Sequence, residues 1–151
     1  SPPARADRAR PVLDRLTSAG IVPDGSDTSR LLDQAAHGGD PAGPLVVSHG
    51  DLHIRHLLVD QAGEAAGVID WGDLCLADPA VDLSIAYFGF AGQARADLLS
   101  AYGRPVTADR ELAARTLAIF LAVALAEYAA AEDCPVLLRE SLAGLRRATA
   151  A

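Results

Sequence analysis

The segment from residue 45 to residue 73 constrains the fold more than any other part of the chain. It reads LVVSHGDLHIRHLLVDQAGEAAGVIDWGD and holds three short apolar, β-branched runs, at 45–49, 56–60 and 65–71. The last two are joined by a connection of a few residues that contains Gly63. Two runs with such a connection are typical of a β-hairpin. The segment therefore predicts a small antiparallel sheet whose loops carry unusually many histidines and aspartates.

The hairpin also predicts which side chains meet. If its turn centres near Gly63, residues whose numbers sum to about 126 face each other across the pair. His56 then lies opposite Asp70, with Cβ atoms about 5 Å apart. Asp51 lies in the short loop before the hairpin and should overhang the same end. Two neighbouring carboxylates repel unless a cation or proton intervenes, so Asp51, His56 and Asp70 together favour a divalent metal site.

Helical patterns dominate the rest of the chain. Turn residues and caps divide these patterns, with Pro11 in a first turn, stops at Gly20, Gly38 and Gly103, and caps at Asp78 and Thr107. The predicted helices cover 11–20, 27–38, 78–88, 93–103, 107–131 and 135–150. The fold class predicted is α+β and mostly helical.

Composition narrows the class of protein. With 151 residues, half of them apolar, the chain is expected to form a single domain over 1–151. Its formal net charge of −7 disfavours a nucleic-acid partner. The apolar run Thr116–Ala126 is shorter than the ~20 residues a membrane span needs, which predicts a buried helix and no membrane partner. Two cysteines without metal-type spacing suit a reducing, cytoplasmic location.

Three sequence blocks carry a family resemblance. HGDLHIRH, then GVIDWGD, then DPAVDL follow one another across residues 45–88. Together they resemble the catalytic and metal-binding loops of the aminoglycoside and macrolide phosphotransferase family, whose pattern is H-G-D-x-x-x-x-N, then I-D, then D-P-x-x-D-L. The resemblance implies a protein-kinase-like fold, of which this chain is the carboxy-terminal lobe, with the hairpin carrying the catalytic and metal loops.

The resemblance implies roles for four residues. Asp51 matches the catalytic aspartate that accepts or orients the substrate hydroxyl, and Asp70 matches the aspartate that holds Mg²⁺ on the nucleotide phosphates. His56 stands where most relatives have Asn, a second metal position at which nitrogen ligation suits Mn²⁺ better than Mg²⁺. His53 occupies the place of a phosphate-contacting residue in kinases, and an exposed loop histidine is its alternative. The implied co-substrate is ATP or GTP.

Other residues of these loops have structural interpretations. His49 is expected to fix the loop backbone, and Asp78 to cap a helix. Asp82 is expected in the first turn of that helix, with a second role in bonding the catalytic loop. Asp73 is either close to the metal or solvated.

Two features suggest that the chain is part of a longer protein. It opens without Met and contains no Lys, whereas the resemblance implies a nucleotide-binding amino-terminal lobe with a glycine-rich loop and a Lys. We therefore expect that this lobe is the missing partner and that the 151-residue chain alone is inactive. The absence of Lys also excludes a P-loop or Schiff-base mechanism in this chain.

Rival functions remain open. A metal-dependent phosphoesterase could use Asp51 and His53 for one metal and Asp70 for another, but no histidine follows residue 56 to complete such a site. A non-catalytic substrate-binding fragment is the third class. The acceptor is expected to be a small molecule with a hydroxyl group, an antibiotic or a metabolite. Acidic side chains on the last helices would suit a cationic one; they are Glu127, Glu132 and Asp133.

Overall fold

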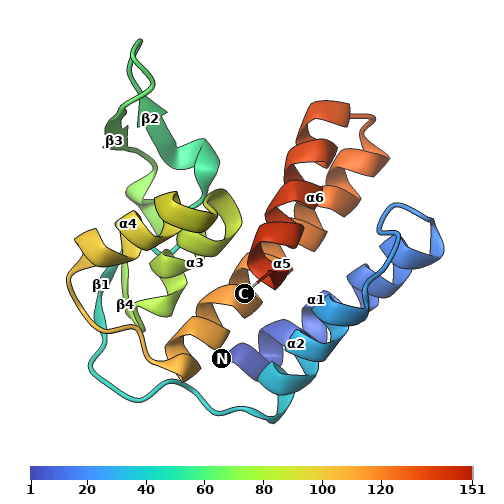
Figure 1. Ribbon diagram of the computed structural model, residues 1–151, viewed down its shortest axis with the longest axis horizontal. Helices are drawn as coiled ribbons and strands as arrows, with labels where there is room; N and C mark the ends of the chain where they lie inside the picture. Colours follow the sequence, from blue (N-terminus) through green and yellow to red (C-terminus); the bar gives the residue numbers. More distant parts are fainter. Residues whose placement is uncertain (151) are drawn as a thin grey trace.

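The computed structural model describes residues 1–150 as a mostly helical fold with two small sheets. Figure 1 shows the hairpin projecting away from the helices. The elements in chain order are α1 (Pro2–Ser18), α2 (Ser26–His37), β1 (Val46–Ser48), η1 (Ile54–His56), β2 (Leu57–Val59), β3 (Ala65–Val68), η2 (Trp71–Asp73), β4 (Cys75–Ala77), α3 (Ala80–Gly89), α4 (Gly92–Tyr102), α5 (Ala108–Ala131) and α6 (Pro135–Thr149).

Helix α5 is the centre of the core and packs against α1, α3 and α6. Thr107 caps it, as predicted, because its hydroxyl accepts a hydrogen bond from the Arg110 N–H at 3.3 Å. Small side chains recur along it at a spacing of four, which lets the neighbouring helices approach closely. The fully buried ones are Ala114, Ala118, Ala122 and Ala126.

By length and composition, α5 could also cross a membrane. The core helix of a folded protein passes the same test, and 56% of the most apolar window of α5 is buried. Because α5 packs on three other helices, we assign it as a core helix, in agreement with the buried helix that the sequence predicts.

Helix α1 begins nine residues earlier than the sequence predicts. The prediction placed Pro11 in the first turn, whereas the helix starts at Pro2 and Pro11 lies inside it, exposed to solvent. An internal proline costs a helix about 3 kcal/mol. The compensating contribution is a stripe of buried side chains that packs on α5, formed by Ala6, Ala9, Leu13 and Leu16.

The predicted hairpin is present, but its register differs by one residue. Leu57 pairs with Val68 and Leu58 with Gly67, after which a bulge shifts the pairing at Val59. The bulge could not be inferred from a turn centred on Gly63. His56 consequently lies in η1 rather than in the strand, and its backbone carbonyl accepts a hydrogen bond from the Ile69 N–H at 3.0 Å.

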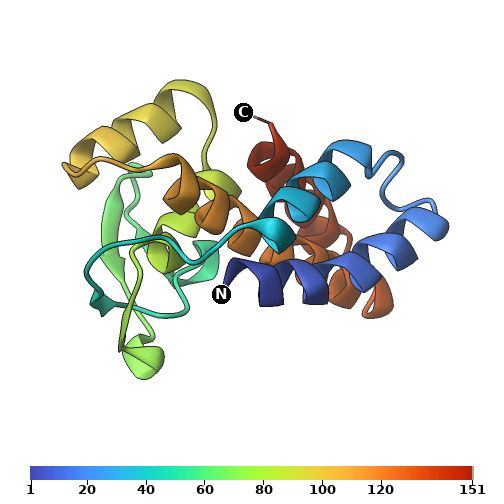
Figure 2. The ribbon, with the colours of Figure 1, turned by 90° about the horizontal axis from the view of Figure 1, so that it is seen from below.

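The run at 45–49 pairs with a strand that the sequence analysis missed. Strand β1 is antiparallel to β4, with Val46 opposite Ala77. Strand β4 is only three residues long and was hidden between the IDWGD block and the next helix. This pairing places Ser48 opposite Cys75 and so brings the start of the loop at 49–53 beside the end of the loop at 69–74. Figure 2 shows both loops on the side of the molecule away from α2.

Candidate active site

His49 ties the first loop to the end of the hairpin. Its side chain is buried, and its Nε2 donates a hydrogen bond to the carbonyl of Ile69 at 2.8 Å. Its Nδ1 accepts one from the Asp51 N–H at 3.3 Å. These two partners fix the tautomer, since a carbonyl can only accept and an N–H can only donate. His49 is therefore a structural residue, as the sequence predicts, and not a free base.

Asp82 holds the same loop from the opposite side. Its two carboxylate oxygens accept hydrogen bonds from the N–H groups of His49, at 2.7 Å, and Gly50, at 3.1 Å. This confirms the second role expected of Asp82. Asp78 is not the N-cap that the sequence predicts, because the helix begins at Ala80 and Pro79 takes the N-cap position. The Asp78 carboxylate still accepts a hydrogen bond from the Ala80 N–H at 2.8 Å.

Gly50 is required by the contact between the two loops. Its φ is +89°, a backbone conformation that side chains disfavour, and a Cβ atom placed there would lie 2.2 Å from the carbonyl oxygen of Asp73. The loop at 49–53 therefore packs so tightly on the backbone of η2 that no side chain fits at residue 50. Asp73 is exposed in that turn, which favours the solvated alternative for its side chain.

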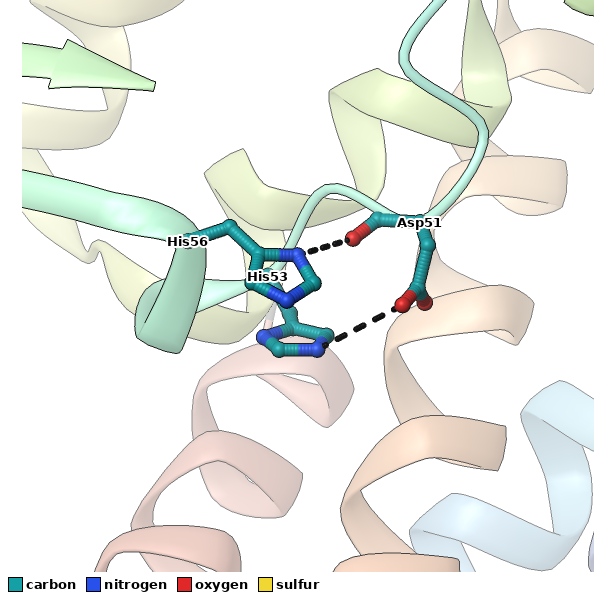
Figure 3. Close-up of side chains that lie close together, drawn as sticks. All are labelled: Asp51, His53 and His56. Atoms are coloured by element: carbon teal, nitrogen blue, oxygen red, sulfur yellow. Dashed lines mark hydrogen bonds and ion pairs between the residues drawn. The ribbon is translucent and has the colours of Figure 1, made fainter. Parts of the chain in front are cut away.

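Asp51 lies at the centre of the loop, and its backbone is held at both ends. Its N–H is bound by His49, and its carbonyl accepts a hydrogen bond from Nδ1 of His56 at 2.8 Å. Figure 3 shows its carboxylate turned toward His53, whose Nε2 lies 3.6 Å from Oδ2. The carboxylate is 46% exposed, so a substrate hydroxyl can reach it.

The pair of His56 and Asp70 forms despite the shift in register. When His56 is unprotonated, its Nδ1 donates to the Asp51 carbonyl and the lone pair of Nε2 is free, 3.4 Å from Oδ2 of Asp70. Asp70 reaches this position because it adopts the left-handed conformation, with φ 65° and ψ 61°. Two acceptor atoms facing each other at this distance repel unless a cation or a proton lies between them. The pair therefore fits a divalent metal, with the other imidazole nitrogen held by a backbone carbonyl.

His53 is more enclosed than the sequence suggests. Its side chain is 18% exposed and stacks on His56 with ring centroids 3.8 Å apart. Among residues 1–150, its buried Nδ1 has no hydrogen-bond partner. Burial, followed by the charge of a protonated His56, lowers the pKa of His53 below its ordinary value. A neutral His53 at pH 7 can donate a hydrogen bond from Nε2, but it does not supply a fixed positive charge for phosphate.

Ligand atoms of Asp51, His53 and His56 lie within 4.8 Å of one another, a spacing that could hold a metal ion. The two imidazole planes, however, are stacked at only 29° to each other. Because the nitrogen lone pairs lie in the ring planes, the stacked rings cannot both direct a lone pair at one ion without rotating. The better metal pair is therefore His56 with Asp70.

Two residues near Asp51 were missed by the sequence analysis. Arg5 and Arg8 line a cavity of about 210 Å³ together with Asp51. They come from the part of α1 that precedes the predicted helix start. A helical stripe at Ala6, Ala9 and Leu13 was the signal that could have extended the helix.

Comparison with known proteins shows the family of this chain and its similarity to a solved structure. The model of a family described as the phosphotransferase enzyme family matches residues 1–115. The structure of a macrolide 2'-phosphotransferase type I superimposes with a TM-score of 0.53 and 24% sequence identity, covering 96% of this chain and 49% of that one. That likeness shows the fold.

One curated relative is also similar. The uncharacterized protein YcbJ of Bacillus subtilis (strain 168) is 43% identical over 54 residues, which are 36% of this chain and 18% of that protein. The chain thus spans about half of the similar solved structure and less than a fifth of the curated relative.

Proposed function

Because the chain belongs to the phosphotransferase enzyme family, we propose that it transfers the γ-phosphoryl group of ATP or GTP to a hydroxyl of a small molecule. The observation that carries this proposal is the placement of Asp51. Its backbone is fixed by His49 and His56 while its carboxylate stays accessible. Phosphoryl transfer depends mostly on positioning and charge neutralisation, so a rigidly held, exposed carboxylate suits the residue that orients the attacking hydroxyl.

The other residues act around that carboxylate. Asp70 and His56 would hold the divalent metal, Mg²⁺ or Mn²⁺, which neutralises charge on the nucleotide phosphates when bound. His53 lies beside the Asp51 carboxylate, with its Nε2 3.6 Å from Oδ2, and can donate one hydrogen bond from Nε2. His49 and Asp82 keep the loop in place without touching a reactant.

In this proposal the chain is a carboxy-terminal lobe. Its match to about half of the macrolide phosphotransferase structure is consistent with one part of a longer fold. The nucleotide would bind between this lobe and an amino-terminal lobe elsewhere in the protein, and turnover would require both.

Substitution of Asp51 tests the proposal in the full-length protein that carries this chain. Phosphate ester formation is followed by ³¹P NMR with ATP or GTP, Mg²⁺ and a panel of aminoglycosides, macrolides, amino alcohols and hydroxy acids. Asp51→Asn should lower turnover by about 10²–10⁴-fold, the usual cost of removing a positioned acid or base. Nucleotide affinity should be unchanged, because Asp51 meets the hydroxyl and not the phosphates.

The matched control is Asp97→Asn, an exposed aspartate on α4. It should leave both quantities unchanged. If Asp51→Asn greatly weakened nucleotide affinity while turnover at saturating nucleotide survived, the role assigned to Asp51 would be wrong. Metal-dependent hydrolysis of p-nitrophenyl phosphate without nucleotide would instead support the phosphoesterase.

A further inference from the structure

The cavity beside Asp51 has a mixed lining. Arg5 and Arg8 are its cationic residues. The other residues are mostly apolar and come from the catalytic loop, α3 and α5; they are Gly50, Leu52, Val81, Ser84, Leu117, Phe120 and Leu121. At about 210 Å³ the cavity suits part of a ligand the size of a short aliphatic chain. A ligand that fills this cavity would contact both the arginines and the apolar residues.

Neither arginine has a counter-ion among residues 1–150. Six other arginines form ion pairs with acidic side chains: Arg10, Arg15, Arg30, Arg110, Arg115 and Arg147. Five more also lack an ion pair among residues 1–150, but they do not line this cavity; they are Arg55, Arg95, Arg104, Arg139 and Arg146. Arg5 is half-buried, and neither it nor Arg8 makes an ion pair or a side-chain hydrogen bond in that part of the chain. Burial and the charge of Arg8 lower the pKa of Arg5 below its ordinary value.

This arrangement is unfavourable without an anion. Arg5 is partly buried and loses hydration, whereas Arg8 is exposed. Two like charges at one cavity repel, and an anion that binds between them relieves this repulsion. The arrangement also runs against the rest of the molecule, whose formal net charge is −7. Two cations at one cavity of an acidic protein favour the binding of negative charge there.

We propose that the acceptor bound beside Asp51 is an alcohol that carries an anionic group on a short apolar body. The anionic group would contact Arg5 and Arg8, the apolar body would contact Leu117, Phe120 and Leu121, and the hydroxyl would meet Asp51. This inference rests on the proposed function, whose acceptor class it specifies.

The acids that suggested a cationic acceptor do not line this cavity. Glu127 is paired with Arg15 at 2.7 Å, and Glu132 and Asp133 lie beyond the carboxyl end of α5. A nucleotide phosphate is the other source of negative charge. The apolar walls favour the acceptor, and neither Asp70 nor His56, which would hold the metal on the phosphates, lines the cavity.

Binding of three matched alcohols tests the inference without requiring turnover. The probes are 6-hydroxyhexanoate, 1,6-hexanediol and 6-amino-1-hexanol, titrated into the full-length protein by isothermal calorimetry or ligand-observed NMR. The hydroxy acid should bind at least about tenfold more tightly than the amino alcohol, since charge-assisted hydrogen bonds to guanidinium are strong. In Arg5→Gln this preference should disappear while the affinity for the diol stays the same.

Three further measurements test whether the preference for the hydroxy acid depends on the charge of Arg5. Arg5→Lys, which keeps the charge, should retain most of the preference and shows that loss in Arg5→Gln is not misfolding. Arg139→Gln removes the same charge from an exposed position that does not line the cavity and should change nothing. ATP and GTP affinities should be equal in wild type and Arg5→Gln.

The inference is overturned if the three probes bind equally, if none binds, or if Arg139→Gln weakens binding as much as Arg5→Gln. Loss of nucleotide affinity with unchanged acceptor binding would assign the arginines to the nucleotide instead. Because the probes are titrated without nucleotide, a protein that shows the preference but transfers no phosphate would refute the proposed function and leave this assignment intact.

Discussion

The helical core and the site loops are held together by different forces. The core around α5 consists of buried alanines, leucines and aromatic rings whose burial is worth about 25 cal/mol per Å² of apolar surface. The loops at 49–56 and 69–73 bury few apolar side chains, and Trp71, Leu74 and Ile69 are exposed. They are instead held by polar contacts: His49 donates to the Ile69 carbonyl, His56 donates to the Asp51 carbonyl, and the Asp82 carboxylate accepts from the His49 N–H.

This difference predicts that the two regions respond differently to substitution. Apolar burial is spread over many contacts, so a change in the core should lower the free energy of unfolding and leave the site intact. The loops depend on a few directional contacts, so a change there should displace Asp51 and affect turnover before it affects folding. Two glycines in close contacts, one in each region, allow the comparison to be tested.

The largest effect is expected for Gly50→Ala. Its Cβ would lie 2.2 Å from the Asp73 carbonyl, and a backbone oxygen cannot move without moving the loop. A displacement of about 1 Å at a reacting group can cost about 10² in rate, so turnover in the full-length protein should fall at least that far. The measurement is phosphate transfer at saturating nucleotide, together with the unfolding midpoint.

Gly63→Ala is the matched control for this change. Gly63 also has a positive φ, +83°, but nothing lies within 4 Å of its Cβ position. Both variants carry similar backbone strain, about 1–2 kcal/mol, and only Gly50→Ala adds a collision. Equal activity in the two variants would contradict the close contact between the loops.

Gly144→Ala should have the opposite signature. A Cβ at this position in α6 would lie 2.6 Å from the buried ring of Phe88 in α3. Overpacking of this kind costs about 1–3 kcal/mol, reduced by the roughly 1 kcal/mol that alanine gains over glycine in a helix. Chemical denaturation should show a lower free energy of unfolding, with turnover at 25 °C within twofold of wild type.

A Phe88→Leu substitution in the Gly144→Ala background gives a second test. The smaller side chain relieves the collision, so the double variant should recover part of the lost stability relative to the sum of the two single changes. Additive losses would mean that the two helices are not in the tight contact described here.

The accuracy of the sequence-based predictions also differs between the helical core and the site loops. The helices from α2 onward were predicted to within a few residues because caps such as Thr107 and stops such as Gly103 are local signals. The start of α1 was wrong because tertiary packing on α5 overrides the preference of Pro11 for a first turn. Strand β4 was missed because three residues carry too little periodicity, and only the partner β1 defines it.

In the candidate site, the contact between His56 and Asp70 was predicted from an incorrect register. The strands pair one residue away from the predicted alignment, yet the side chains meet because Asp70 turns into the left-handed conformation. Neither the bulge nor that conformation has a signature in the sequence. The roles of Asp51, His53, His56 and Asp70 in a reaction stay predictions, whereas the structural roles of His49 and Asp82 are visible in their hydrogen bonds.

The smallest effect is expected for His56→Asn, which restores the residue typical of the family. His56 does two things: it donates from Nδ1 to the Asp51 carbonyl and leaves Nε2 beside Asp70. If Nε2 binds the metal, loss of the nitrogen ligand should lower Mn²⁺ affinity relative to Mg²⁺ by a few fold, because nitrogen suits Mn²⁺ better than it suits Mg²⁺. Binding of Mn²⁺ to the full-length protein, measured by electron paramagnetic resonance in competition with Mg²⁺, gives this ratio without any assay of turnover.

Asp70→Asn is the companion variant and should weaken the binding of both metals together, since it removes a charged oxygen ligand that both prefer. An unchanged ratio of Mn²⁺ to Mg²⁺ affinity in His56→Asn would mean that His56 only holds the loop backbone. His49 and His56 would then both be structural residues, and His53 would be the one histidine of the loop without such a role.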